Sequence, residues 1–382
     1  MKRSKKSIIY LFIVLLCLSG WPSISSAAGS VSAHSAILME QKSGRVLYAK
    51  NADQVSRIAS ITKIMTAILA IESGKINKTV TVSHSAVGVE GSSVYLVEGE
   101  KIKLKDLVYG LMLRSGNDAA VAIAEAVGGS EDGFVYLMNK KAEEIGMTNT
   151  TFQNPHGLDD HENHRSTAHD MALLMRYAMN NKIFKEISGT KVYRMKHPEE
   201  KWDRVWKNKN KLLTTLYAYC TGGKTGYTKL AKRTLVTTAT KDGMDLIAVT
   251  INAPDDWNDH ISMYENAFDK YDMTSLAAKG ELADIKNSFY KDQLYIKRNV
   301  VYPLTKKEQS SVEVKTTLIQ PKKQWKETGE IPNVVGKLDI YRSGETIDSV
   351  PIYFEKQSEQ QKGFFDKVKR LMFIQSGAKT DG

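Results

Sequence analysis

Cysteine is scarce in this sequence, and the motifs of some other protein classes are missing from it. The chain has 382 residues but only two cysteines, Cys17 and Cys220, and Cys17 lies in the N-terminal segment described below. If that segment is removed, the remaining thiol cannot form an intramolecular disulfide. The net charge is +11. No nucleic-acid-binding motif accompanies this charge, so we expect no nucleic-acid partner.

The histidines do not indicate a metal site. Four of them gather in one loop-like stretch that also contains Asp, Glu and Asn. This stretch lacks the two histidines, four residues apart, with which a metallopeptidase helix binds zinc. We therefore expect no metal and no other cofactor, and we interpret these side chains as ordering a loop. The four are His156, His161, His164 and His169.

The first 27 residues are predicted to be a secretory signal peptide. Four cationic residues precede an apolar stretch at residues 8–18, and small residues at 25–28 suit cleavage near Ala27. A membrane-retained anchor is the alternative, but the apolar stretch is short for spanning a bilayer. Cleavage would lower the net charge from +11 to +7, because it removes four cationic residues and no acidic ones.

Three short motifs stand in order along the chain and together suggest serine chemistry with lysine as the base. They are Ser-x-x-Lys at residues 60–63, Ser-x-Asn at residues 115–117 and Lys-Thr-Gly at residues 224–226. A serine hydroxyl is a poor nucleophile until a base takes its proton, and a nearby lysine can do so if its own charge is suppressed. Each motif alone is weak, because Ser-x-x-Lys occurs four times and Lys-Ser/Thr-Gly twice.

Local context selects one set of motifs. The residues after Ser60 are apolar nearly all round the helical period, so Ser60 is expected to open a buried helix with Lys63 on the same face. The Ser-x-Asn interrupts two apolar helical runs with Gly116 as the turn residue, although a plain helix cap is the alternative. The Lys-Thr-Gly is expected on a strand beside a hairpin with an Asp-Gly turn, where Gly226 would let a substrate backbone approach; an ordinary surface turn is the alternative.

The three motifs together resemble those of the penicillin-binding protein and serine β-lactamase superfamily. Within it the chain is similar to the low-molecular-mass D-alanyl-D-alanine carboxypeptidases, most densely over residues 33–270, and in particular to the sporulation-associated enzyme of bacilli. The resemblance implies a serine enzyme that removes the terminal D-alanine from peptidoglycan stem pentapeptides during cell-wall or spore-cortex maturation. β-Lactams such as penicillin would acylate it as substrate mimics. The additional residues that carry the resemblance are Asn149, Thr150, Phe152, Asn154, His156, Gly157, Leu158, Ser166, Thr167, Ala168, Asp170, Met171 and Ala172.

The residue types of the first two motifs suggest catalytic roles. Ser60 would attack the carbonyl of the D-Ala-D-Ala bond while a neutral Lys63 accepts its proton. Ser115 would pass a proton to the departing amine. Asn117 would orient Lys63 and the substrate amide.

The third motif is expected to bind the end of the substrate. Lys224 and Thr225 would bind the terminal D-alanine carboxylate beside Gly226. The backbone N–H groups of Ser60 and Tyr227 would form the oxyanion hole.

One position departs from the family pattern. Relatives often place an arginine shortly before the third motif to help hold the carboxylate, and this chain offers Lys209 there. A lysine keeps the charge but loses the bidentate fork of the guanidinium. Lys209 is therefore a candidate for this role.

The predicted fold class is α+β. An N-terminal strand pair, the later hairpin and the Lys224 strand would form an antiparallel sheet with helices on both sides. Beyond residue 273, short alternating segments indicate a β-rich domain, which the resemblance implies is a small β-sandwich. The predicted boundaries are a signal peptide at 1–27, a catalytic domain at 28–273, the β-rich domain at 274–356 and a tail at 357–382.

The tail is predicted to associate with a membrane surface. Apolar residues between Phe364 and Ile374 recur at i, i+4 and i+7 with Lys367, Lys369 and Arg370 between them. This pattern is typical of an amphipathic helix lying in a membrane interface, and capping of the β-rich domain is the alternative. The protein would then be anchored peripherally on the outer face of the cytoplasmic membrane, or on forespore membranes.

Other functions remain open. A β-lactamase would share the three motifs, but the Glu-x-x-Leu-Asn deacylation motif of class A enzymes is absent between the second and the third. A D,D-endopeptidase on the same fold would differ in pocket shape and water access. A non-catalytic wall-binding protein is the third alternative, against which the intact Ser60, Lys63, Ser115 and Lys224 argue.

Overall fold

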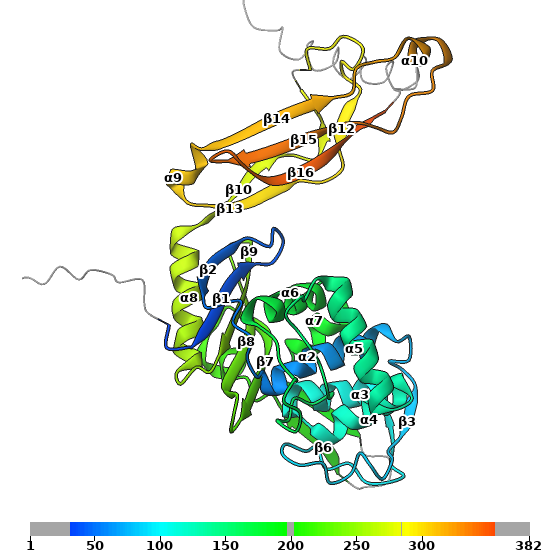
Figure 1. Cartoon of the computed structure of the whole chain (residues 1–382), viewed down its shortest axis with the longest axis vertical. Coiled ribbons are helices and arrows are strands. Elements are labelled where there is room, and N and C mark those ends of the chain that lie inside the picture. Colours follow the sequence, from blue (N-terminus) through cyan, green and yellow to red (C-terminus); the bar gives the residue numbers. More distant parts are fainter. Residues whose placement is uncertain (1–30, 197–201, 284, 356–382) are drawn as a thin grey trace, which may run out of the picture. The chain divides into compact units, whose positions relative to one another are not determined.

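The computed structural model describes residues 31–196, 202–283 and 285–355 (Figure 1). The predicted signal peptide at 1–27 and the predicted tail at 357–382 lie outside these residues. The chain divides into two compact units. Unit 1 contains residues up to 39, 46–239 and 246–267, and unit 2 contains 40–45, 240–245 and the chain from 268 onward. Because two short segments near residues 40 and 240 belong to unit 2, no single cut in the sequence separates the units, and the predicted domain boundaries stay a prediction.

Unit 1 is built on a five-stranded sheet with the strand order β2-β1-β9-β8-β7. The turn between β1 and β2 contains the Lys-Ser-Gly at residues 42–44, so this copy of the motif belongs to a hairpin. The turn between β8 and β9 uses Asp242 and Gly243, both at positive φ, as the Asp-Gly pair predicts. The strands are β1 (Ser35–Glu40), β2 (Val46–Lys50), β7 (Cys220–Thr228), β8 (Lys232–Lys241) and β9 (Met244–Ile251).

Helices cover both faces of this sheet (Figure 1). Val236 of β8 belongs to the main core with the helix α2 (Lys63–Glu72), whereas its neighbour Leu235 clusters with Trp257 of α8 (Asp256–Lys270). Successive residues of a strand point to opposite faces, so the sheet separates α8 from α2. This arrangement confirms the predicted α+β class.

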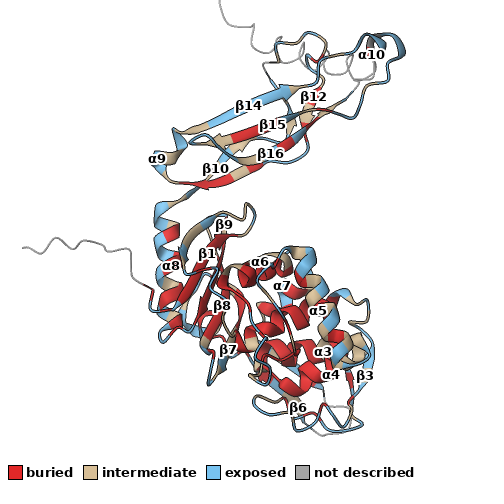
Figure 2. Cartoon of the chain, viewed as in Figure 1, coloured by how far each residue is buried: buried red, intermediate tan, exposed pale blue. Residues whose placement is uncertain are grey.

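The helix that follows Ser60 lies at the centre of the main core. Every residue of α2 except the last is buried, as Figure 2 shows. A helix that is apolar all round must be enclosed by other elements, and here further helices pack around it. The helical elements are η1 (Ala59–Thr62), α3 (Leu104–Tyr109), η2 (Gly110–Arg114), α4 (Asn117–Gly128), α5 (Glu131–Ile145), α6 (Ala168–Met179), α7 (Lys182–Ser188) and η3 (Leu212–Leu216).

Two short hairpins complete unit 1. β3 (Thr79–Thr81) pairs with β4 (Lys101–Lys103), and β5 (Val192–Lys196) pairs with β6 (Asp203–Lys207). The strands β5 and β6 are not among the elements predicted from the sequence. Each has five residues and only one of them is buried, so more and less exposed positions alternate over too short a stretch to give a clear apolar pattern.

Unit 2 contains two antiparallel sheets that share one hydrophobic core. One sheet has the order β11-β12-β16-β15-β14 and the other pairs β10 with β13. Val300 of β13 lies in the same cluster as Leu338 of β15 and Val350 of β16, so the sheets pack on each other, as expected for a small β-sandwich. The elements are β10 (Asp272–Ala277), β11 (Gly280–Glu281), β12 (Leu294–Ile296), β13 (Val300–Leu304), α9 (Lys306–Gln309), β14 (Val312–Leu318), α10 (Lys323–Thr328), β15 (Val334–Arg342) and β16 (Glu345–Phe354).

Candidate active site

Ser60 lies in a 3₁₀ turn immediately before a buried helix. The turn η1 passes directly into α2, so Lys63 is the first residue of the α-helix. The Lys63 Nζ lies 3.0 Å from the Ser60 Oγ, within hydrogen-bonding distance. The sequence analysis expected the serine to open the α-helix, whereas it stands one tight turn ahead of it. The turn starts at Ala59, whose φ of 50° is uncommon for a residue with a side chain.

Two further oxygens surround the Lys63 amine. Its Nζ donates to the Asn117 Oδ1 at 2.7 Å and to the His156 carbonyl oxygen at 2.6 Å. A neutral amine has two N–H donors and one lone pair. When these two oxygens take the donors, the lone pair is left to face the Ser60 Oγ. The arrangement therefore suits an amine that accepts the serine proton.

The environment of Lys63 suppresses its charge. The side chain is fully buried, and this burial holds the pKa of Lys63 well below its usual range. The positive charges of Lys224 and Lys209 lower that pKa further. These are the conditions under which a lysine can act as a base near neutral pH.

Ser115 occupies a strained corner between η2 and α4. It has a φ of 65°, in the left-handed region, and it is 5% exposed. The sequence analysis placed the turn at Gly116, which is wrong because Gly116 has an ordinary φ of −58°. Gly116 instead permits close packing, since a Cβ there would lie 2.7 Å from the Asp118 carboxylate. Left-handed residues other than glycine are uncommon, and such strained conformations cluster at functional sites.

Lys224 joins the third motif to the second. From β7 its Nζ donates to the Ser115 Oγ at 3.0 Å and to the Thr225 carbonyl oxygen at 2.6 Å. Burial, with a smaller contribution from the charge of Lys209, lowers the pKa of Lys224 to about 7. Near neutral pH the Lys224–Ser115 pair can therefore relay a proton.

Gly226 is the point where β7 touches the nucleophile turn. A Cβ on Gly226 would lie 2.4 Å from the Thr234 Oγ1 and 2.9 Å from the Ser60 backbone nitrogen. The sequence analysis explained this glycine by the approach of a substrate, whereas its close neighbours are the protein's own atoms. Thr225 is half-buried, and Tyr227 is exposed at the rim.

Lys209 belongs to the same group of cations. Its Nζ donates to the Ser92 Oγ at 3.0 Å, and burial followed by the charge of Arg114 lowers its pKa. Its charge lowers the pKa values of both Lys63 and Lys224, which places it beside both motifs. Its binding of a carboxylate stays a prediction.

Asp118 organises the site, although it is not among the site residues predicted from the sequence. The carboxylate is 2% exposed and accepts hydrogen bonds from the Ser93 hydroxyl and from the backbone N–H groups of Val94 and Leu96. It therefore fixes the loop at residues 92–96 against the start of α4. The only sequence signal is an acidic residue directly after the Ser-x-Asn motif, which is equally typical of any helix N-terminus.

Two of the four clustered histidines order the nucleophile turn. The Thr62 hydroxyl donates to the Ala59 carbonyl oxygen at 2.8 Å and lies 2.8 Å from the His164 Nε2. The His164 Nδ1 accepts from the Gln153 backbone N–H, so Nε2 carries the proton and donates to Thr62. Burial lowers the pKa values of His156 and His164 to about 3, so both rings are neutral. In the described part of the chain, no three side chains of the types that bind metals gather at one point.

One of the decoy Ser-x-x-Lys serines has a structural role. Ser188 is buried at the end of α7, and its Oγ accepts from the Gly223 backbone N–H at 2.8 Å. This contact supports β7 next to Lys224. Ser188 and Lys191 form one of the four Ser-x-x-Lys matches, and the structure buries this serine against the active-site strand.

Known proteins share both parts of this chain. Residues 23–255 match the family model described as D-alanyl-D-alanine carboxypeptidase, and residues 271–360 match that of the penicillin-binding protein 5 C-terminal domain. The chain is 35% identical over 352 residues to the D-alanyl-D-alanine carboxypeptidase DacF of Bacillus subtilis, with 89% of each chain covered. It is 32% identical over 364 residues to DacC of Escherichia coli, with 89% of this chain and 88% of the other covered. The solved structure of penicillin binding protein 5 from Haemophilus influenzae matches 86% of this chain and 98% of its own, with a TM-score of 0.70 and 27% identity.

Proposed function

The chain belongs to the D-alanyl-D-alanine carboxypeptidase family, and we propose that Ser60 is its nucleophile and Lys63 its general base. The protein is a serine-type D-Ala-D-Ala carboxypeptidase of the penicillin-binding class. One observation carries the assignment of the base. Two carbonyl-type oxygens engage the donors of the buried Lys63 amine and leave its lone pair toward the Ser60 Oγ.

Acylation begins when the Ser60 Oγ attacks the carbonyl of the bond between the two D-alanines. Lys63 takes the serine proton, and the negative charge moves to the carbonyl oxygen. The backbone N–H groups of Ser60 and Tyr227 stabilise this oxyanion, as donors aimed at developing charge do. The close approach of Gly226 to the Ser60 backbone nitrogen supports an oxyanion hole at this point.

The leaving group departs with a proton from Ser115. The hydroxyl protonates the amine of the terminal D-alanine as the tetrahedral intermediate collapses, and Lys224 resupplies the proton. Lys224, Thr225 and Lys209 bind the terminal carboxylate. The proton on Lys63 then passes back to Lys224, which restores both groups. The neutral Lys63 activates a water that hydrolyses the ester on Ser60 and releases the shortened stem peptide. A penicillin opens its ring on Ser60, but its leaving group stays attached, so the ester is released slowly.

Labelling with a fluorescent penicillin tests the nucleophile. The wild type is expected to bind the label and to release D-alanine from a stem pentapeptide. Ser60→Ala is expected to lose the label and about 10⁵-fold or more in kcat, as other enzymes do when a nucleophile is removed. Ser288→Ala, which removes an exposed serine of a decoy motif, is the matched control and should change neither. Persistent labelling of Ser60→Ala would overturn the assignment.

Export and peripheral membrane anchoring are part of the proposal. They rest on the sequence of residues 1–27 and 357–382, and the resemblance to the sporulation-associated enzymes adds a role in the spore cortex. None of the helices within residues 31–196, 202–283 and 285–355 has the length and apolar character to cross a bilayer. Deletion of the chain after Glu355 is expected to move the exported protein from the membrane to the soluble fraction. Retention of the truncated protein on membranes would count against the anchor.

A further inference from the structure

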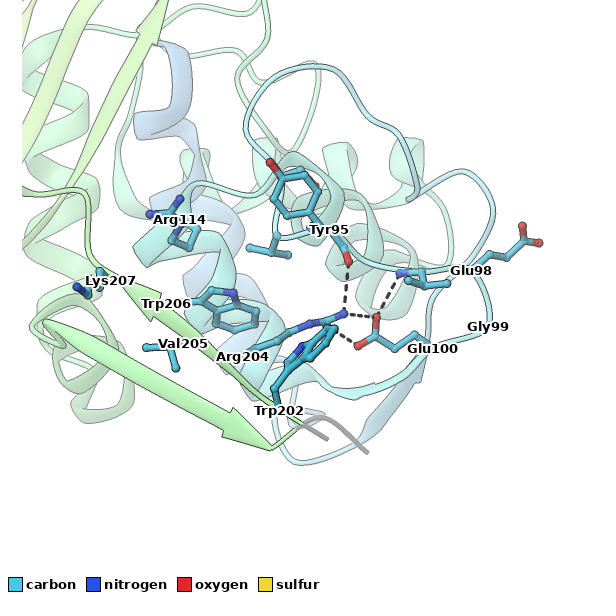
Figure 3. A pocket seen from close by; sticks show the side chains of 13 residues that line it. Tyr95, Glu98, Gly99, Glu100, Arg114, Trp202, Arg204, Val205, Trp206 and Lys207 are labelled. Carbon is cyan, nitrogen blue, oxygen red and sulfur yellow. Dashed lines mark hydrogen bonds and ion pairs between the residues drawn. The ribbon is translucent and has the colours of Figure 1, made fainter. Parts of the chain in front are cut away.

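A cavity of about 930 Å³ lies beside the active site in unit 1 (Figure 3). One side is the loop that carries Tyr95, and the other is the β5–β6 hairpin with Trp202 and Trp206. Tyr95 is 81% exposed and Trp202 is 66% exposed. A single exposed aromatic side chain is ordinary, but exposed aromatic side chains grouped at one place indicate a binding site, and here two of them border one cavity.

Packing and hydrogen bonds support the walls of the cavity. The Trp206 ring stacks on Tyr193 with centroids 6.2 Å apart, and Tyr193 stacks on Tyr109 at 3.7 Å. On the facing side, Tyr95 has a left-handed φ of 61°, which its N–H bond to the Ser93 Oγ at 2.8 Å helps to hold. A preformed cavity binds a ligand without the entropic cost of ordering its own side chains.

Polar groups of opposite charge are paired at the centre of the cavity. The Arg204 guanidinium binds both carboxylate oxygens of Glu100, at 2.5 and 3.0 Å, and also reaches the Tyr95 carbonyl oxygen at 3.3 Å (Figure 3). Both side chains of the pair are largely buried. Because the pair is internally neutral, it offers oriented hydrogen-bonding groups without a strong field. That chemistry suits an uncharged polar ligand better than a carboxylate-rich peptide.

Three segments that line the cavity also lead to residues of the active site. Arg114 lines it and precedes Ser115, while Lys207 lines it two residues before Lys209. The loop with Tyr95 is attached to the carboxylate of Asp118, the residue after Asn117. A ligand in the cavity would therefore contact the segments that position the catalytic residues.

We propose that this cavity is a subsite for an amino sugar of the glycan strand that carries the stem peptide. The proposal rests on the proposed function and names a second part of the same substrate. A sugar ring has apolar C–H faces that pack on aromatic rings, and its edges carry hydroxyl and acetamido groups that hydrogen-bond. Tyr95 and Trp202 at the rim can pack on the C–H faces of the sugar, and the Arg204–Glu100 pair can form hydrogen bonds with the groups at its edges.

Two substrates with the same stem peptide test the proposal. The wild type is expected to cleave a disaccharide-pentapeptide with a higher kcat/KM than the free pentapeptide. The double variant Tyr95→Ala, Trp202→Ala is expected to lower the first value about tenfold, the effect of losing one good contact, and to leave the second unchanged. Trp202→Phe, together with the native Tyr95, should restore most of the loss. Tyr136→Ala removes an exposed tyrosine on α5, outside the cavity lining, and should alter neither value.

A binding experiment separates this proposal from the proposed function. Titration of the full chain with the peptide-free disaccharide is expected to change the tryptophan fluorescence, and the double variant should not respond. Equal kcat/KM values for the two substrates in the wild type would overturn the subsite. An equal loss on both substrates in the double variant would also overturn it, because the cavity would then serve the peptide or the loop. If the wild type released no D-alanine from either substrate but still bound the disaccharide, the proposed function would fail and the sugar site would stand.

Discussion

At the scale of single residues, three lysines set the chemistry of the site: Lys63 and Lys224 are buried, whereas Lys209 is exposed. Each lies near the others, and burial makes their charges unfavourable, so the pKa values of Lys63, Lys209 and Lys224 are all lowered. Lys63 has oxygen partners that suit a neutral amine, whereas the other two are available for an anionic substrate. A single kind of side chain thus supplies both a base and a carboxylate site.

The pH dependence of the free enzyme follows from these shifts. Lys63 must be neutral to accept a proton, so kcat/KM is expected to rise with pH through a pKa well below the usual range for lysine. Lys224 must be charged to bind the carboxylate, so kcat/KM is expected to fall above pH about 7. D-Alanine release measured across pH tests both limbs. A substrate with an amide in place of the terminal carboxylate should keep the rising limb and show a lower kcat/KM throughout, while its falling limb then reports only the proton that Lys224 supplies to Ser115. A rate that climbs steadily beyond pH 10 would contradict the assignment.

The values of KM and kcat can show whether Lys209 binds the substrate carboxylate or acts through its neighbours. Lys209→Ala is expected to raise KM for the pentapeptide about 10- to 100-fold, the range of one charged hydrogen bond, with a small effect on kcat. Lys209→Arg keeps the charge and should recover most of the affinity. The amide-ended substrate is the control, because it offers no carboxylate to lose. A drop in kcat alone would mean that Lys209 acts through the pKa values of its neighbours and does not bind the carboxylate.

At the scale of elements, regular patterns were predictable and irregular ones were not. The helix α5 ends at Gly146, whose left-handed conformation is typical of a glycine after a helix, and the sheet of unit 1 contains the strand pairs that turn residues and alternation indicate. The pairing of Ser60 with Lys63 could be predicted as well, because it depends on local spacing. The left-handed Ser115 and the buried Asp118 could not, because their conformations depend on contacts with the loop at residues 92–96, far away in the sequence.

The loop that carries His156 supports the nucleophile turn through a glycine. A Cβ on Gly157 would lie 2.0 Å from the Ala59 carbonyl oxygen, and its φ of +85° is already unfavourable for other residues. Gly157→Ala is therefore expected to displace η1, to destabilise the fold by about 2–4 kcal/mol and to slow penicillin labelling. Chemical unfolding and the rate of labelling measure the two effects.

A second glycine provides the matched control for this substitution. Gly129 has a similar φ of +79°, and no atom lies within 4 Å of the Cβ position. Gly129→Ala should therefore show the conformational penalty of about 1 kcal/mol alone, with normal labelling. Equal labelling rates in the two variants would mean that Gly157 does not position the nucleophile.

At the scale of the whole molecule, the main hydrophobic core of unit 1 and the core of unit 2 are separate clusters among the described residues. In unit 2, Arg45 donates to the Pro303 carbonyl oxygen and binds the Glu308 carboxylate at 2.5 Å. Although burial raises the pKa of Glu308, hydrogen bonds from Arg45 and the Thr305 backbone outweigh it and lower that pKa to about 2. The ion pair therefore joins residues from distant parts of the sequence within this unit.

Separate cores predict separate responses to heating. A bound penicillin gains its contacts only when unit 1 is folded, so it should raise the melting temperature of that unit and leave unit 2 unchanged. Arg45→Ala should do the reverse and destabilise unit 2 by about 1–2 kcal/mol, because it removes the nearer of the two charged partners of Glu308 and leaves only Arg342, at 3.4 Å. Differential scanning calorimetry with and without penicillin resolves the two transitions.

Arg298→Ala is the control for this prediction. It breaks a more exposed ion pair with Asp348 in the same unit and should change the stability of that unit by about 0.5 kcal/mol or less. A single transition that shifted both with penicillin and with Arg45→Ala would contradict this prediction. It would mean that the two units unfold together in one cooperative step.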